Sequence, residues 1–288
     1  MNWILFFSTH TTLALIFTFI FCAIIGSFLN VVIYRYPLML QEEWKQECLM
    51  QLALPLPEKS PTFNICLPRS HCCHCKKLLP FWLNIPIVSY LILRGKCHYC
   101  KTHISIQYFL VEVLTPLLSI LVISKLGFTL SALAVIILTW GLITLSFIDF
   151  NNQFLPDTIT YTLLWLGLII STKCLFVSSI HAIFGAVIGY LFLWSIAKFY
   201  ILIRNKEGMG LGDCKMLAMI GAWVGLISLV NVLIFSTLLA LIVGIILLAY
   251  KKIERANPIP FGPYIAIAGW CTVLYGDQLT QWIVRWVS

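Results

Sequence analysis

Long apolar stretches dominate the chain, and short polar segments separate them. Most are near the length of about 20 residues that a helix needs to cross the hydrocarbon core of a bilayer. The stretches cover residues 11–34, 106–124, 129–148, 158–177, 180–203, 214–229, 231–250 and 259–278. This pattern predicts an all-α polytopic membrane protein with about eight transmembrane helices.

The composition excludes a water-soluble globule. Of the 288 residues, 60% are hydrophobic and only 10% are charged, against roughly a quarter charged in ordinary soluble domains. The first apolar stretch lacks a basic start and continues to Tyr34, so we interpret it as a retained span and not as a cleaved signal peptide.

The distribution of basic residues predicts how the chain is oriented in the membrane. The net charge is +8, and the Lys and Arg residues collect in the segments 35–101, 198–215 and 251–255. By the positive-inside rule these segments face the cytosol, so we interpret the charge as a sign of topology and not of nucleic-acid binding. The basic residues of the opposite loops are Lys125, Lys173 and Arg285.

Three parts of the chain follow from this topology. Residues 1–34 are predicted to form the first transmembrane helix, residues 35–105 a cysteine-rich cytosolic module, and residues 106–288 a core of seven membrane helices. The module holds seven of the 11 cysteines and four of the six histidines. Such a composition is typical of a small, irregular domain held together by a metal ion.

Two CxxC pairs in this module predict a structural zinc site. The pairs are Cys72 with Cys75 and Cys97 with Cys100, and 21 residues separate them. Four thiolates complete a tetrahedron around zinc and leave no coordination position for water. Disulfides are the alternative, but a cytosolic segment lies in a reducing compartment. The neighbouring histidines could replace a cysteine as ligand, and the adjacent Cys73 could shift the register.

Two acidic residues are candidates for catalysis because acids near membrane spans are scarce. Asp149 ends the third span, and Asp213 opens the sixth. Two crossings lie between them, so both carboxylates are expected at the cytosolic face. Two carboxylates brought close together share one proton and can activate a water molecule against an amide. The alternative is that each Asp caps a helix or pairs with Lys215 or Arg204.

Glycines directly precede the second acid, at Gly208, Gly210 and Gly212. Glycine permits positive φ and leaves backbone N–H groups open to a ligand, so we expect this loop to let an extended peptide lie beside Asp213. Neither this string nor any other part of the chain has the strand followed by GxGxxG that a Rossmann cofactor site requires.

Six strings, in order, make the chain resemble the type IV prepilin peptidases, which are membrane aspartic proteases with a GxGD motif. The strings are GSFLNVVIYR (26–35), the two CxxC pairs, RGKCHYC (94–100), FIDFNNQFLPD (147–157), GMGLGDCK (208–215) and IPFGPYIA (259–266). By position, Asp149 and Asp213 match the catalytic aspartates of that family, and Cys72, Cys75, Cys97 and Cys100 match its metal-binding cysteines. Asp157 matches a family position whose role looks structural.

The resemblance implies an enzyme of the bacterial inner membrane that cuts the basic leader from type IV prepilins and pseudopilins. Cleavage follows a glycine at the cytosolic face. The same protein commonly then methylates the new N-terminal residue with S-adenosylmethionine. No residue of this sequence can be named for binding that cofactor.

Two other functions remain as alternatives. A transporter would use intramembrane acids to carry protons or cations, and it predicts charges near the bilayer midplane. A thiol-redox protein would use the CxxC pairs for disulfide exchange, and it predicts these pairs on the oxidising side of the membrane.

Overall fold

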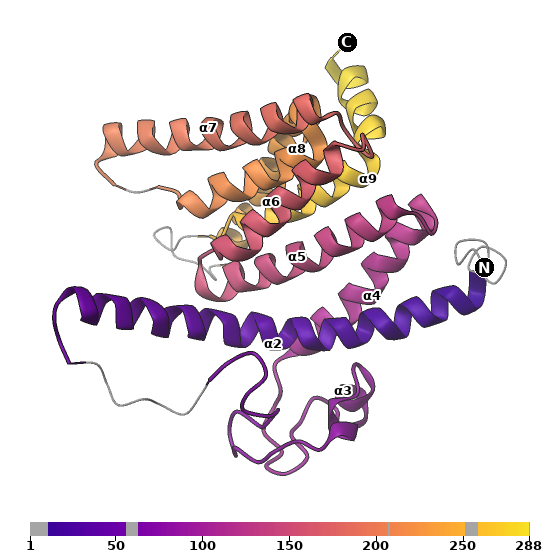
Figure 1. The fold of residues 1–288 in the computed structure, drawn as a ribbon, viewed down its shortest axis with the longest axis vertical. Helices are drawn as coiled ribbons and strands as arrows, with labels where there is room; N and C mark the ends of the chain where they lie inside the picture. Colours follow the sequence, from indigo (N-terminus) through magenta and orange to yellow (C-terminus); the bar gives the residue numbers. More distant parts are fainter. Residues whose placement is uncertain (1–10, 56–62, 207, 251–258, 288) are drawn as a thin grey trace. The chain divides into compact units, whose positions relative to one another are not determined.

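The computed structural model describes residues 11–55, 63–206, 208–250 and 259–287. The chain divides into two compact units, Met1–Phe128 and Thr129–Ser288. Helices make up most of the described chain, and the only β structure within it is two isolated bridges (Figure 1). The predicted all-α membrane fold is therefore confirmed.

The first unit contains two long helices with the cysteine-rich module between them. Its elements are α2 (Thr11–Gln51), the 3-10 helix η1 (Phe81–Asn84), α3 (Val88–Ile92) and α4 (Ile106–Leu126). Helix α4 therefore falls in the same unit as the module. Helix α2 continues well beyond residue 34, where the predicted first transmembrane span ends, and residues 1–10 of that span lie outside the described residues.

Burial of Arg35 explains why α2 does not end at its first charged residue. Only 7% of Arg35 is exposed. Its guanidinium donates to three backbone carbonyls of the module, those of Asn64 (3.1 Å), Ile65 (3.2 Å) and Pro68 (2.6 Å). Because carbonyls satisfy the buried guanidinium, the arginine fastens the module to α2.

In its described residues, the second unit is built from helices and the segments that connect them. The helices are α5 (Leu130–Asn152), α6 (Asp157–Ser171), α7 (Ser179–Arg204), α8 (Leu211–Ala249) and α9 (Gly262–Val287). The oxygen of Thr129 caps the start of α5 by accepting from the Ala132 N–H, and Gln153 ends it in the left-handed conformation. This ending places Asp149 in the last turn of α5.

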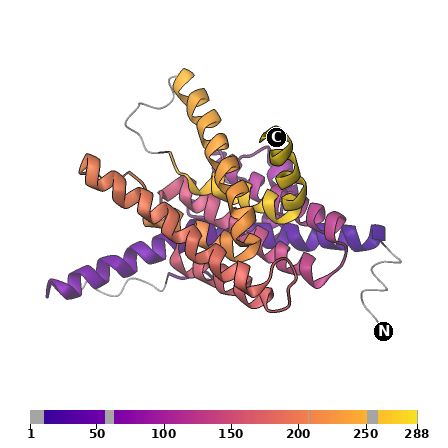
Figure 2. The ribbon, with the colours of Figure 1, turned by 90° about the horizontal axis from the view of Figure 1, so that it is seen from above.

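Helix α8 bends sharply at Gly225. This residue has φ 74° and ψ 175°, a conformation open to glycine and strained for other residues. Its position falls inside the predicted apolar stretch 214–229, close to the boundary with the stretch 231–250. Figure 2 shows the two parts of α8 (orange) running in different directions.

Small residues allow α7 and α8 to pack with their backbones in contact. A Cβ on Gly185 would collide with the carbonyl oxygen of Gly221, and a Cβ on Gly221 would collide with that of Gly185. Gly189 also lies against the α8 backbone. Close approach of this kind, with glycines four residues apart, is a common way for membrane helices to associate. It fixes the start of α8, and with it Asp213, against α7.

Within the described residues, five helices are long and apolar enough to cross a membrane: α2, α4, α5, α7 and α8. Helix α6 is apolar but shorter, at 15 residues. Each apolar stretch predicted from the sequence lies on a helix over most of its length, and two of them share α8.

Candidate functional site

Two turns of the cysteine-rich module have the same hydrogen-bond pattern. In the first, the Cys72 N–H donates to Lys77 O (3.0 Å) and the Lys76 N–H donates to Cys72 O (2.9 Å). In the second, Cys97 pairs in the same way with Thr102 and Lys101. An isolated β-bridge flanks each turn, and the lysine after the second cysteine of each pair has φ 58°. The module therefore presents each CxxC pair on a similar tight turn.

The four predicted cysteines come together. The sulfur atoms of Cys72, Cys75, Cys97 and Cys100 all lie within 4.8 Å of one another, and those of Cys72 and Cys100 are 3.7 Å apart. Zinc–sulfur bonds of about 2.3 Å in a tetrahedron place the sulfur atoms about 3.8 Å apart. The cluster therefore fits a tetrahedral zinc ion. None of the described histidines belongs to it.

Local hydrogen bonds prepare one of these thiols to bind metal. The Sγ of Cys100 lies 3.3 Å from the Thr102 hydroxyl. Hydrogen bonding to this hydroxyl, assisted by the backbone of Thr102, lowers the pKa of Cys100 to about 6. The thiolate is the form of cysteine that ligates metal, so this environment favours the ligating form at neutral pH.

Cys73 has a different setting from its neighbours. It stands outside the four-cysteine cluster and is exposed. Its thiol lies near the hydroxyls of Tyr34 on α2 and Tyr108 on α4. It therefore helps to connect the first turn of the module to the two long helices of the unit.

The structure holds Asp149 firmly at the end of α5. The residue is 5% exposed, and its Oδ2 accepts a hydrogen bond of 3.0 Å from the backbone N–H of Gly262. Gly262 is the first residue of α9, and a Cβ built on it would lie 2.5 Å from the same oxygen. Only glycine can therefore donate this bond without moving the carboxylate.

Asp213 lies in the first turn of α8, close enough to Asp149 for their charges to interact. Leu155 connects the two sides of the site. Its side chain lies 3.2 Å from a Cβ built on Gly212 and 3.4 Å from one built on Gly262. The structure thus brings both predicted acids to the same end of the second unit.

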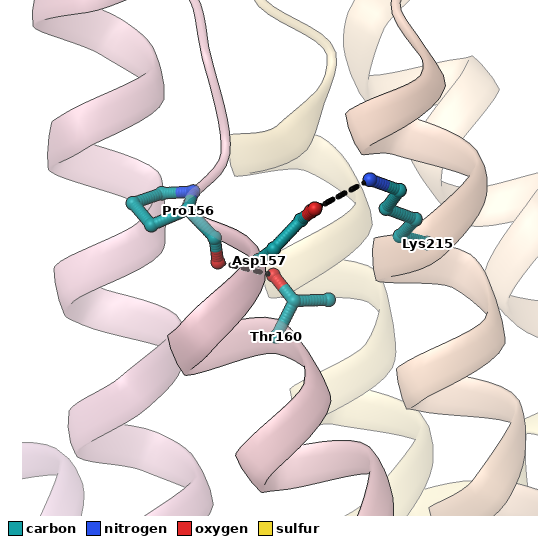
Figure 3. Close-up of polar contacts among 4 residues, drawn as sticks. All are labelled: Pro156, Asp157, Thr160 and Lys215. Carbon is teal, nitrogen blue, oxygen red and sulfur yellow. Dashed lines mark hydrogen bonds and ion pairs between the residues drawn. The ribbon is translucent and has the colours of Figure 1, made fainter. Parts of the chain in front are cut away.

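The third acid of this region has a separate partner. Both carboxylate oxygens of Asp157 accept from Lys215 Nζ at 2.7 Å (Figure 3). Lys215 also lies over the ring of Tyr161, 5.6 Å from its centroid. Lys215 is therefore engaged with Asp157 and not with Asp213. Within the described chain, no hydrogen bond or ion pair holds the Asp213 carboxylate, and its helix is capped by Gly210 without a side-chain contact.

The glycines before Asp213 do not use the positive φ that glycine permits. None of the three has a positive φ. Instead, a Cβ on Gly208 would lie 2.5 Å from the ring of Tyr200, and one on Gly212 would lie against Leu155. Two of the three glycines therefore serve close packing, and Gly210 is the N-cap of α8.

Gly262 and Leu155 are site residues that the sequence reasoning did not identify. A signal for Gly262 was present, because Pro263 follows it at the start of an apolar stretch, and proline favours the first turn of a helix. That signal marks where a helix begins and does not reveal which carboxylate the free N–H binds. Leu155 carries no signal of its own.

Replacing Cys72 should remove the metal. We expect the wild-type chain, purified in detergent, to contain zinc in a one-to-one ratio, and Cys72→Ser to lose most of it because three thiolates remain around the ion. Elemental mass spectrometry measures this, and thermal unfolding should show a lower midpoint for Cys72→Ser. Cys73→Ser is the matched control and should keep its zinc. Full zinc content in Cys72→Ser would contradict the assignment.

Comparison with known proteins gives a consistent family assignment. The model of the bacterial peptidase A24 N-terminal domain matches residues 20–126, and that of the type IV leader peptidase family matches residues 136–245. No solved structure matches the chain.

Curated relatives match over nearly the whole chain, and all three described here are named prepilin leader peptidase/N-methyltransferase. The protein of Stutzerimonas stutzeri is 47% identical over 267 residues, which is 91% of this chain and 92% of its own. That of Pseudomonas aeruginosa is 46% identical over 276 residues, or 96% and 95% of the two chains. That of Neisseria gonorrhoeae is 41% identical over 266 residues, or 92% of each. At this identity and coverage, the chain belongs to the type IV leader peptidase family.

Proposed function

We propose that this chain is a membrane aspartic endopeptidase that removes the basic leader of type IV prepilins and pseudopilins after a glycine. Asp149 and Asp213 are its catalytic pair. The observation that carries the proposal is the placement of Asp149, held by the Gly262 N–H and within electrostatic reach of Asp213. The names of the relatives support the substrate class.

The two carboxylates have different surroundings, which suits them to different roles. Asp149 accepts an N–H bond at the start of α9, and donors at a helix start stabilise negative charge. Among the described residues, nothing donates to Asp213. Asp149 is therefore the ionised member that takes a proton from water, and Asp213 is the protonated member that hydrogen-bonds the scissile carbonyl oxygen.

The two carboxylates can donate and accept every proton that hydrolysis of the peptide bond requires. The water oxygen bonds to the carbonyl carbon while one water proton passes to Asp149 and the proton of Asp213 passes to the carbonyl oxygen. When the tetrahedral intermediate collapses, a hydroxyl proton returns to Asp213, the C–N bond breaks, and the leaving nitrogen takes the proton from Asp149. The products are a leader that ends in a carboxyl group and a pilin with a free amine.

The position of the acids fits such a substrate. A precursor with a basic leader and a following hydrophobic helix would sit in the membrane with its cleavage site near the headgroups. Asp149 is three residues from the end of α5, and Asp213 is two residues into α8. At 1.5 Å per residue both lie within about 5 Å of their helix ends.

The positions of the acids and of the cysteines argue against the two alternative functions, a transporter and a thiol-redox protein. A transporter would place its acids near the bilayer midplane, whereas Asp149 and Asp213 occupy terminal turns. A thiol-redox protein would pair two cysteines at a time, whereas four sulfur atoms share a single cluster of tetrahedral size.

We further propose that the enzyme resides in the bacterial inner membrane with its acids and its cysteine module at the cytosolic face. The distribution of basic residues supports this orientation. The second activity, transfer of a methyl group from S-adenosylmethionine to the new N-terminal amine, is supported by the names of the relatives. The zinc ion would hold the module together and would take no part in peptide-bond cleavage, because four thiolates fill its coordination sphere.

Replacing either acid by its amide should abolish cleavage. An amide cannot exchange the protons that the mechanism requires, so we expect Asp149→Asn and Asp213→Asn to lose at least about a thousandfold in rate. Mass spectrometry of a prepilin precursor measures removal of the leader. Asp157→Asn is the control and should remain active, because Asp157 pairs with Lys215. Cleavage at the wild-type rate by either test variant would refute the role of that residue.

Methylation should depend on the donor and not on the two acids. With S-adenosylmethionine present, the cleaved pilin should gain the mass of one methyl group, and without it the pilin should remain unmethylated. Pilin that is supplied already cleaved should be methylated by Asp149→Asn as well as by wild type. Failure of wild type to add the methyl group would remove this activity from the proposal and leave the peptidase intact.

A further inference from the structure

Part of the cysteine module is unusually apolar for a cytosolic domain. Residues 81–92, with the sequence FWLNIPIVSYLI, form η1 and α3; we call them the apolar segment. Phe81 and Ile92 are each 75% exposed, and Trp82 is 57% exposed. Several large apolar side chains exposed along one short segment indicate that something other than water covers them. The other exposed members of the group are Ile85, Val88 and Leu91.

A partly buried contact ties this segment to the two membrane-spanning helices of the first unit. The N–H of Ile87 donates to Oε2 of Glu112 on α4 at 2.7 Å, and α2 packs against the same residue, since a Cβ built on Gly26 would lie 3.0 Å from the Glu112 Cα. Glu112 lies six residues after the start of α4 at Ile106, which corresponds to about 9 Å along the helix. The centre of the apolar segment therefore lies level with the interior of both spans and not beyond their ends.

The backbone of Ile87 adopts an unfavourable conformation at its hydrogen bond to Glu112. Ile87 has φ 63°, a conformation that β-branched residues adopt only when the surrounding structure imposes it. In that conformation its N–H points to the Glu112 carboxylate. The glutamate is thus the partner of a backbone group of the module.

A groove between the apolar segment and α2 also places the segment beside a membrane span. It has a volume of about 650 Å³ and is lined by residues 81 and 84–88 on one side and by α2 side chains from Phe19 to Val31 on the other. Those two α2 residues are 12 positions apart, or about 18 Å along the helix. Figure 1 shows α3 beside the half of α2 that leads toward the N-terminus. One wall of the groove is thus a membrane span.

Many backbone polar groups of the segment have partners, which suits a membrane environment. Non-helical backbone is tolerated at membrane depth only where its polar groups have partners. Pro80 and Pro86 have no N–H to satisfy, and Ser89 Oγ donates to the carbonyl of Ile85 (2.8 Å) and lies 3.2 Å from that of Trp82. The N–H groups of Leu83, Val88, Ser89 and Leu91 donate to nearby carbonyls of the module.

We propose that the apolar segment is embedded in the bilayer leaflet on the module's side, with lipid acyl chains against its exposed side chains and in the groove along α2. Glu112 is the positioning residue that holds it there. Arg94 and Lys96 follow the segment directly and can meet the lipid phosphates. Trp82 suits the interface, where aromatic rings gather. The module is thus anchored in the membrane by its own surface as well as by α2 and α4.

Quenching of Trp82 fluorescence by brominated lipids tests this directly. The full chain is placed in lipid nanodiscs, and the Trp82 signal is taken as the difference between wild type and Trp82→Phe. We expect lipids brominated on the acyl chains to remove most of this signal. Trp44→Phe is the matched control, because Trp44 lies among Glu42, Glu43 and Lys45 and its difference signal should persist. A Trp82 signal as insensitive as that of Trp44 would overturn the proposal, whether water or a second protein covers the segment.

Variants of Glu112 separate anchoring from general stability. The amide oxygen of Glu112→Gln can still accept the Ile87 N–H, so this variant should keep the acyl-chain quenching of Trp82. Glu112→Leu cannot accept it and should lose much of the quenching while it retains its zinc and its helix content. Equal quenching in both variants would contradict the anchoring role of Glu112.

Discussion

The hydrogen bond from the Gly262 N–H to Asp149 determines where the first carboxylate of the site can lie. The donor is the first residue of α9, and the first N–H groups of a helix have no partner within it. An acid that accepts such a bond satisfies the helix start and is stabilised by it. The absence of a side chain at Gly262 is part of the arrangement, since a Cβ would occupy the space of the carboxylate oxygen.

Helix ends recur throughout the site. Asp213 lies in the first turn of α8, and Asp149 lies in the last turn of α5 beside the first residue of α9. Ends of spans are where water and a polar peptide can reach carboxylates while the rest of each helix stays in lipid. Packing of α7 against α8 through Gly185 and Gly221 keeps these ends in place. The core of the second unit is thus a scaffold for groups at one of its ends.

The sequence predicted those parts of the protein that depend on local pattern. Helical stretches follow from apolar length, and the four-cysteine cluster follows from the CxxC spacing. The prediction failed where distant contacts decide. The first transmembrane span was predicted to cover residues 1–34, and the pattern did not indicate that carbonyls from residues 64, 65 and 68 would satisfy Arg35 or that α2 would continue to Gln51. The glycines before Asp213 were interpreted as a loop that lets an extended peptide lie beside it, and the sequence did not reveal that Gly208 and Gly212 make room for Tyr200 and Leu155. The partner of Asp149 is 113 positions away, and no local pattern connects them.

The central claim, that the Gly262 contact positions Asp149 for proton transfer, is tested most directly by the cleavage rate of Gly262→Ala. The substitution keeps the N–H and adds a methyl group 2.5 Å from Asp149 Oδ2, so the carboxylate must move. A displacement of about 1 Å can lower a rate by about a hundredfold. We predict such a loss of cleavage with methylation of pre-cleaved pilin unchanged. Gly276→Ala, also on α9, should cleave normally, because its added Cβ would meet its nearest neighbours, in Ser228 and Thr272, at an ordinary contact distance of 3.8 Å. Wild-type cleavage by Gly262→Ala would contradict the account.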